Sequence, residues 1–86
     1  MLHRIPRLAL FSHPSCSLCH SAKTSILNVR NRIPFEFEEI NIKLPKNKKF
    51  HDMYAFDVPV LHINDEEKLM HKITEQDLEK QLNNLD

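Results

Sequence analysis

A chain of 86 residues has room for one small domain, so we expect a single domain over residues 1–86. Hydrophobic residues at 41% and charged residues at 28% are typical of a folded globular domain, and a formal net charge of zero argues against nucleic acid as a partner, because nucleic-acid modules carry clustered basic residues. No apolar run approaches the roughly 18 residues that span a membrane, and the complete lack of glycine excludes glycine-rich phosphate loops.

The first third of the chain predicts a strand followed by a helix. Residues 8–11 form a continuous apolar run of strand length, which predicts a central strand covered on both faces. The proline that follows breaks this strand, and because Ser15 is a good N-cap, we expect a helix that begins at Cys16 and ends before Pro34. One apolar stripe at helical spacing supports it: Leu18, Ala22, Ile26 and Val29.

The middle of the chain predicts an edge strand and a short helix. Apolar and acidic residues alternate over 35–38, and the alternation resumes over 40–42, which indicates a half-exposed edge strand with a bulge at 38–39. Pro45 suits the first turn of a helix that ends near Ala55. Its common apolar face is formed by Phe50, Met53 and Tyr54.

The last third predicts a β-hairpin and a closing helix. Residues 58–63 are a β-branched run with a proline near the start, where proline disturbs a sheet least. A turn over 64–67 lets residues 68–73 return antiparallel beside it. Thr74 and Asp77 resemble a capping box at the start of a helix. Its apolar stripe is Leu78, Leu82 and Leu85.

The resulting element order is βαβαββα. A βαβ unit leaves two parallel strands, and the hairpin adds antiparallel ones, so the sheet should be mixed, with helices on its faces. We therefore predict an α/β protein with a four-stranded mixed sheet, which is the architecture of a minimal thioredoxin-like fold.

Cys16 and Cys19 form the one constellation with reactive potential. A helix N-terminus presents a partial positive charge and unpaired N–H groups, which favour an anionic sulfur, so we expect Cys16 to be partly thiolate at neutral pH. Cys19 lies one turn further on, less exposed, and near enough to attack a mixed disulfide formed at Cys16. We therefore expect Cys16 to be the nucleophile and Cys19 the resolving thiol. The alternative is that both are inert core residues.

Other side chains near the pair are candidates for substrate binding. His13 precedes Cys16 by three residues, and a protonated imidazole at the mouth of the site would further stabilise the thiolate. His20 is equally suited to face solvent. A cis Val58–Pro59 bond facing the helix end would expose backbone groups to which an extended substrate adds hydrogen bonds. The alternative is an ordinary trans proline at a strand start.

The sequence also resembles the glutaredoxin family. The stretches that carry the resemblance are residues 10–19, which include Cys-Ser-Leu-Cys, and residues 57–60, Asp-Val-Pro-Val. Residues 41–45, 58–63 and 70–73 are similar to a poorly characterised eukaryotic family named only as glutaredoxin-like. The resemblance spans nearly the whole chain and implies a glutaredoxin-like fold.

The resemblance implies roles for individual residues. Cys16 matches the glutaredoxin nucleophile and Cys19 the second thiol. The Val58–Pro59 pair matches the cis-proline segment that lines the glutathione site. The substrate-binding candidates are therefore His13, Ser15, Leu18, Val58 and Pro59.

The chain departs from glutaredoxins where they hold glutathione. His13 stands where many glutaredoxins have lysine, Leu18 takes the place of the usual tyrosine, and Asp57 replaces threonine. The glycine pair that helps to hold the glutathione carboxylate is missing, and Glu75 puts an acid nearby. The Cys-Gly-Phe-Ser signature of the members that bind iron–sulfur clusters is also absent. The scaffold and the thiol chemistry therefore carry over better than glutathione binding.

We therefore expect a glutaredoxin-like thiol–disulfide oxidoreductase whose partner is a disulfide-containing protein or a glutathione mixed disulfide. We expect a monomer with no bound cofactor and no metal, no membrane contact, and glutathione as a candidate reductant. Two cysteines and no recognisable signal peptide favour the cytoplasm. The basic residues 1–7 keep a mitochondrial location as the alternative.

Three other interpretations use the same residues. A redox-inactive module on this fold would dock a protein through residues 58–63 or through the basic N-terminal half. Residues 16–20 also spell the c-type haem attachment pattern, with Met53 or Met70 as a second axial ligand, although the predicted strands fit a helical haem protein poorly. The third is zinc held by both cysteines, His20 and another histidine.

Overall fold

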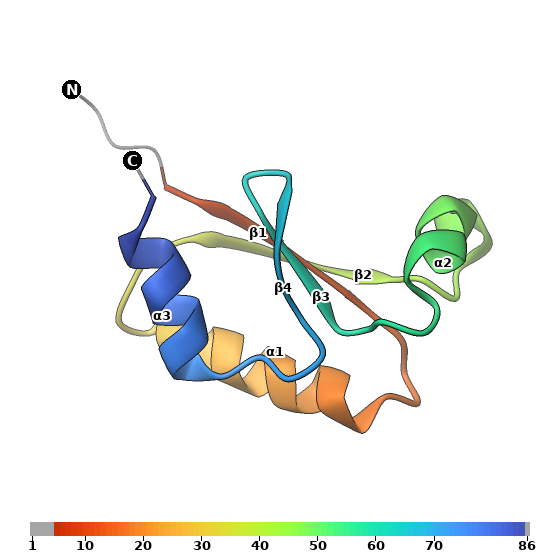
Figure 1. Ribbon diagram of the computed structural model, residues 1–86, viewed down its shortest axis with the longest axis horizontal. Helices are drawn as coiled ribbons and strands as arrows, with labels where there is room; N and C mark the ends of the chain where they lie inside the picture. Colours follow the sequence, from red (N-terminus) through yellow and green to blue (C-terminus); the bar gives the residue numbers. More distant parts are fainter. Residues whose placement is uncertain (1–4, 86) are drawn as a thin grey trace.

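The computed structural model describes residues 5–85 and has the predicted element order (Figure 1). The first four residues of the basic segment 1–7, which kept the mitochondrial alternative open, lie outside the described residues. Among the described helices, none has the length and apolar character needed to cross a membrane. The elements are β1 (Arg7–Ser12), α1 (Ser17–Arg30), β2 (Glu36–Asn41), the 3₁₀ turn η1 (Pro45–Asn47), α2 (Lys48–Tyr54), β3 (Val60–Ile63), β4 (Glu66–Met70) and α3 (Glu75–Asn83).

The four strands form one mixed sheet in the order β2-β1-β3-β4. β1 pairs parallel to β2 and antiparallel to β3, and β3 pairs antiparallel to β4. The apolar β1 is therefore flanked on both sides, whereas the acidic β2 is at an edge, as the sequence predicts. Phe11 of β1 lies opposite Val60 of β3, so the end of β1 and the start of β3 meet at the same end of the sheet.

Helices cover both faces of this sheet. α1 and α3 pack side by side against one face, and α2 packs against the other (Figure 1). The main core lies beneath α1 and α3 and consists of Leu8, Leu10, Ala22, Ile26, Val29, Phe35, Leu61, Ile63, Ile73, Leu78 and Leu82. A smaller core lies beneath α2 and consists of Phe11, Ile42, Tyr54 and Val60.

The start of α1 differs by one residue from the sequence prediction. Cys16, not Ser15, is the N-cap, and the helix proper begins at Ser17. The buried face of α1 consequently includes Cys19, while Leu18 is 47% exposed and does not belong to the stripe. The physical reason is that the sulfur of Cys16 accepts the N–H of Cys19, the third residue of the helix, and so takes the capping role expected of the Ser15 hydroxyl.

The predicted bulge in β2 is wrong. The pairing of β1 with β2 runs without a break, from Arg7 opposite Glu36 to Ser12 opposite Asn41. The alternation therefore continues through Glu39, which takes a position on the α1 face that the sequence pattern reserves for apolar side chains. Glu39 is tolerated there because it pairs with Lys23 of α1 and accepts a hydrogen bond from Ser12.

The remaining elements follow the prediction with local differences. Met53 is 52% exposed and does not share the buried face of α2. The hairpin turn is shorter than predicted, because Asn64 and Asp65 adopt φ values of 52° and 70° and close it without glycine. β4 therefore begins at Glu66, and a register shift follows between Leu61 and His62 of β3.

The predicted cap of α3 is confirmed. The hydroxyl of Thr74 accepts a hydrogen bond from the N–H of Asp77 over 3.1 Å. Leu78 and Leu82 are buried, and Leu85 packs against the same core. The closing helix is thus fixed at its start by its cap and along its length by its apolar stripe.

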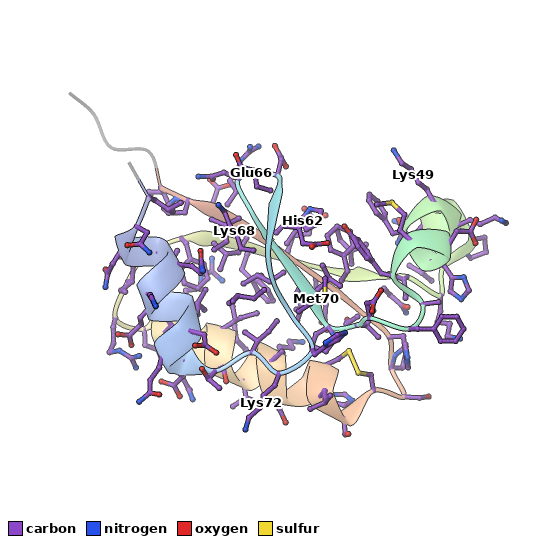
Figure 2. The ribbon with its side chains drawn as sticks, in the orientation of Figure 1. Lys49, His62, Glu66, Lys68, Met70 and Lys72 are labelled. Carbon is purple, nitrogen blue, oxygen red and sulfur yellow. A yellow bond between two sulfur atoms is a disulfide. The ribbon has the colours of Figure 1, made fainter. Side chains whose placement is uncertain are left out.

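Tyr54 and His62 join α2 to the sheet. The hydroxyl oxygen of Tyr54 lies 2.8 Å from Nε2 of His62, and the His62 ring centroid lies 4.6 Å from that of Phe11. His62 is labelled in Figure 2. Burial lowers the pKa of His62 below its ordinary value, against the raising influence of Glu67 and Asp65. Burial, followed by Glu67, raises the pKa of Tyr54.

We expect protonation of His62 to destabilise the fold at mildly acidic pH. Because the pKa of His62 is lowered in the native state, the unfolded chain binds more protons, and stability falls as the pH drops from about 6.5 toward the native pKa. His62→Gln offers Tyr54 an amide partner and removes the titration. Urea denaturation between about pH 7 and pH 5 should show a shallower loss of stability for the variant. If the free energy of unfolding fell equally with pH in both proteins, protonation of His62 would not be the cause of the loss.

The packing of α1 makes a second prediction. Ile26 is fully buried in the main core, whereas the neighbouring Leu27 is 40% exposed. Ile26→Ala should lower the free energy of unfolding by about 2–5 kcal/mol, because it leaves a cavity. The matched control, Leu27→Ala, should cost less than about 1 kcal/mol. Equal losses in urea denaturation would show that α1 buries a different face.

Candidate active site

Cys16 and Cys19 form a disulfide at the start of α1, drawn as the yellow bond in Figure 2. The two Cα atoms are 5.1 Å apart, within the range that a disulfide bridges. Cys16 is half-buried at the helix start, whereas Cys19 faces the protein interior and is 2% exposed. The sulfur of Cys16 is therefore the one that an incoming molecule reaches first.

The helix terminus surrounds Cys16 with backbone donors. The N–H of Cys19 donates to Sγ of Cys16 over 3.1 Å, and the carbonyl oxygen of Cys16 accepts from the N–H groups of Cys19 and His20. Free N–H groups and the helix dipole give this end of α1 a partial positive charge. No acidic residue lies in the first turn to oppose it. A thiolate on Cys16 would therefore be stabilised here after reduction.

The loop before β3 faces the Cys16 sulfur. Its Val58–Pro59 peptide bond is cis, and the carbonyl oxygen of Val58 lies 3.9 Å from Sγ of Cys16. Pro59 is buried, and its carbonyl oxygen accepts the N–H of His71 over 2.8 Å. Between residues 5 and 85, the N–H of Val58 has no hydrogen-bond partner. The loop is thus fixed through Pro59 while a backbone donor of Val58 stays open beside the disulfide.

Sequence reasoning missed a polar pair and an exposed ring on this loop. Nε2 of His71 lies 3.3 Å from Oδ1 of Asp57, directly before Val58. Phe56, one residue earlier, is 98% exposed. His71 and Asp57 are 14 positions apart, and His71 reaches the loop only because β4 pairs with β3. No local sequence signal marks such a pair.

An apolar groove of about 520 Å³ adjoins the site between α1 and the loop after β4. Leu18, the residue before Cys19, forms one wall, which explains why it is exposed. The carboxylate of Glu75 accepts hydrogen bonds from Asn28 of α1 over 3.1 Å and from Arg32, just beyond the end of α1, over 3.2 Å. The groove is lined by Leu18, Ser21, Ser25, Lys72, Ile73, Thr74, Glu75 and Gln76.

A second, polar cleft of about 280 Å³ reaches Cys19 from the opposite side. His13 lines this cleft together with Cys19, and its carbonyl oxygen accepts the N–H of Cys16 over 3.3 Å. Nδ1 of His13 accepts the N–H of Ser15 over 3.2 Å, and both Ser15 and His20 are exposed. The cleft is lined by Ser12, His13, Pro14, Cys19, His20, Lys23, Glu39 and Asn41.

Comparison with known proteins assigns the family. A model of the glutaredoxin-like domain (DUF836) matches residues 7–83. The chain belongs to the glutaredoxin-like family. A glutaredoxin-like protein of Dictyostelium discoideum is 39% identical to this glutaredoxin-like domain over 75 residues, which is 83% of the chain and 69% of that protein.

Solved structures share the fold of this glutaredoxin-like domain. A protein of Nitrosomonas europaea superposes with a TM-score of 0.76 at 23% identity, covering 94% of this chain and 95% of its own. Oxidised thioredoxin O2 of Arabidopsis thaliana superposes with a TM-score of 0.70 at 17% identity, covering 94% and 75%. The predicted thioredoxin-like architecture is thus confirmed.

The metal alternatives find no support in the arrangement of side chains. In the part of the chain that the structure describes, no three His, Cys, Asp or Glu side chains gather as metal ligands. The mixed sheet also differs from the helical fold that the haem alternative requires. The candidate site of the glutaredoxin-like domain is therefore the cysteine pair with its flanking loop, groove and cleft.

We expect Cys16 to react with iodoacetamide before Cys19 once the disulfide is reduced. Cys16 is half-buried at the positive end of α1, while Cys19 is 2% exposed. With limiting reagent near neutral pH, peptide mass spectrometry should locate most of the label on Cys16. The control is the same reaction in urea, where both thiols should be labelled alike. Preferential labelling of Cys19 would contradict the site geometry.

Proposed function

We propose that this glutaredoxin-like domain catalyses thiol–disulfide exchange, with Cys16 as the nucleophile and Cys19 as the resolving thiol. The observation that carries the proposal is the position of Cys16, whose sulfur caps α1, faces the Val58–Pro59 loop and is bonded to Cys19. An accessible sulfur at a helix N-terminus has the microenvironment of a reactive cysteine, which an inert core cysteine lacks.

The reaction begins from the reduced pair. The Cys16 thiolate attacks one sulfur of a substrate disulfide, forms a mixed disulfide and releases the other substrate sulfur as a thiolate. Cys19 then loses its proton and attacks Sγ of Cys16, which releases the second substrate thiolate and forms the Cys16–Cys19 disulfide. The substrate gains two electrons and the protein loses two. A thiol reductant such as glutathione returns the protein to the dithiol state.

The loop and the groove support an extended substrate segment. The open N–H of Val58 and the carbonyl oxygen beside Cys16 offer a donor and an acceptor to a peptide backbone, as in strand addition. Leu18 and the apolar groove provide a place for a side chain next to the attacked sulfur. A disulfide-containing protein is the partner that uses both features.

A glutathione mixed disulfide is the second substrate class. Its carboxylates need cations, and Lys72 is the cation that lines the groove. The two acids that weaken the resemblance to glutathione-binding relatives are both engaged: Asp57 lies against His71, and Glu75 is bound by Arg32 and Asn28. Their charges therefore oppose glutathione less than the sequence suggests. The dithiol chemistry suits a reducing compartment, with the cytoplasm proposed first.

The exposed ring of Phe56 favours a second candidate function, a redox-inactive module that docks a protein. Phe56 is 98% exposed two residues before Val58. Aromatic side chains are frequent anchors of protein interfaces. A module of this kind would bind its partner equally well without either sulfur.

Trapping the mixed disulfide tests the proposal. Cys19→Ser removes the resolving thiol, so a substrate attacked by Cys16 stays attached. Incubation of the reduced variant with cell extract, followed by mass spectrometry under non-reducing conditions, should show glutathione or a protein bound at Cys16. In a disulfide-reduction assay, Cys16→Ser should fall to the rate measured without protein.

The double variant Cys16→Ser, Cys19→Ser is the control and should carry no adduct. Undiminished disulfide reduction by Cys16→Ser would refute the proposed chemistry. Absence of any adduct on Cys19→Ser would favour the docking module, and a partner retained by the double variant would then identify it.

A further inference from the structure

Asp57 is the one acidic residue in the three segments that meet around the Cys16 sulfur and the Val58–Pro59 loop. These segments are residues 12–20, which lead into α1, residues 55–60, which lead into β3, and residues 70–74, which follow β4. Apart from the two cysteines, their other titratable side chains are basic: His13, His20, His71 and Lys72. The carboxylate of Asp57 therefore gives the rim of the site a negative charge that its surroundings do not supply.

The carboxylate of Asp57 is fixed on one oxygen and free on the other. Nε2 of His71 lies 3.3 Å from Oδ1 of Asp57, and because a carboxylate only accepts hydrogen bonds, His71 is the donor. The N–H of His71 donates in turn to the carbonyl oxygen of Pro59 over 2.8 Å, which fixes the histidine to the loop. Between residues 5 and 85, Oδ2 of Asp57 has no hydrogen-bond partner. This second oxygen is thus available to a group that arrives from outside.

Asp57 lies beside the backbone to which a substrate strand would add. The next residue, Val58, has an open N–H and places its carbonyl oxygen 3.9 Å from Sγ of Cys16. A substrate segment that pairs with Val58 brings its own cysteine to Cys16, so a residue next to that cysteine comes opposite Asp57. Phe56, on the other side of Asp57 in the sequence, is 98% exposed and offers an aromatic ring at the same point.

The basic side chains of the site are directed elsewhere. Lys72 lines the apolar groove beside α1 and points away from α2, as Figure 2 shows. Nδ1 of His13 accepts the N–H of Ser15, and Nε2 of His20 lies 3.2 Å from the carbonyl oxygen of Pro14. Both of these rings are thus engaged with the loop before α1. Oδ2 of Asp57 therefore keeps its attraction for a positive group that enters with the substrate.

We propose that Asp57 selects substrate proteins that carry a basic residue, above all arginine, next to the reactive cysteine. The inference rests on the proposed thiol–disulfide exchange and names the class of segment that the site accepts. The guanidinium donates an N–H to Oδ2 of Asp57, and its flat face stacks on the exposed ring of Phe56. This charge-assisted hydrogen bond orients the substrate disulfide toward Cys16. Asp57 stays ionised and exchanges no proton, so the bonds formed and broken are those of the exchange reaction.

Peptides that differ in charge beside their cysteine test this selectivity. Each peptide carries its cysteine as a mixed disulfide with thionitrobenzoate and has arginine, citrulline or glutamate directly before or directly after it. Citrulline has nearly the shape of arginine but no charge. Attack by the reduced protein on the cysteine sulfur releases coloured thionitrobenzoate, so stopped-flow absorbance gives a second-order rate constant. Dividing each rate constant by that measured with free 2-mercaptoethanol removes the influence of the neighbouring residue on the intrinsic reactivity of the disulfide.

The arginine peptide should react about fivefold faster than the citrulline peptide, and the glutamate peptide should react more slowly than both. Asp57→Asn should lower the ratio of arginine to citrulline rates to below about twofold, because the charge is gone. Phe56→Leu keeps an apolar side chain without the ring and should lower the ratio about twofold. The matched control is Asp52→Asn, which changes a carboxylate of α2 that is 60% exposed and should leave the ratio unchanged. Because both rates come from one protein sample, a partial loss of folded protein does not alter the ratio.

The outcomes separate the selectivity from the chemistry. Equal rates for the arginine and citrulline peptides would overturn the role of Asp57, as would an arginine preference that survives in Asp57→Asn. A glutamate peptide or a glutathione–thionitrobenzoate disulfide that reacts faster than the arginine peptide would overturn it as well, since the site would then favour negative substrates. If the reduced protein attacked every peptide no faster than 2-mercaptoethanol at equal concentration, the exchange chemistry itself would be refuted.

Discussion

The site depends on the hydrogen bond from the N–H of Cys19 to the sulfur of Cys16. This hydrogen bond caps the N-terminus of α1 with a sulfur atom, where the usual acceptor is a hydroxyl or carboxylate oxygen. The atom that satisfies the first turn of the helix is therefore also one end of the disulfide. Because both cysteines belong to the same helical turn, the spacing that allows the cap also brings the two sulfurs into bonding range.

The sheet brings the second half of the site to that sulfur. β1 leads into α1, and β3 runs antiparallel to β1, so the start of β3 lies beside the end of β1. The Val58–Pro59 loop therefore faces Cys16, and the pairing of β3 with β4 adds His71 to it. Two faces of α1 contribute to the site. Leu18 on one face borders the apolar groove, and Cys19 on the other face borders the polar cleft.

Two kinds of error in the sequence prediction have a common origin. The spacing predicts that Leu18 and Met53 are buried, yet both are exposed and the next residue in each helix, Cys19 and Tyr54, is buried instead. Residues three and four positions away lie on the same helix face, so spacing alone does not decide which of two adjacent residues faces inward. The sequence pattern indicates a bulge at 38–39 because an acid at an inward position looks like a slip in the alternation. Lys23 and Ser12 make that position acceptable, and both lie on other elements.

The sequence by itself determined the order of the elements, the mixed sheet, the cap of α3 and the position of both cysteines at a helix start. These depend on residues a few positions apart, whose spacing and chemistry suffice. Only the tertiary structure decided that the Val58 carbonyl faces Cys16 and that Ser12 holds Glu39 beneath Cys19. Those contacts join residues 42 and 27 positions apart, and they exist only once strand pairing and helix packing have brought the elements together.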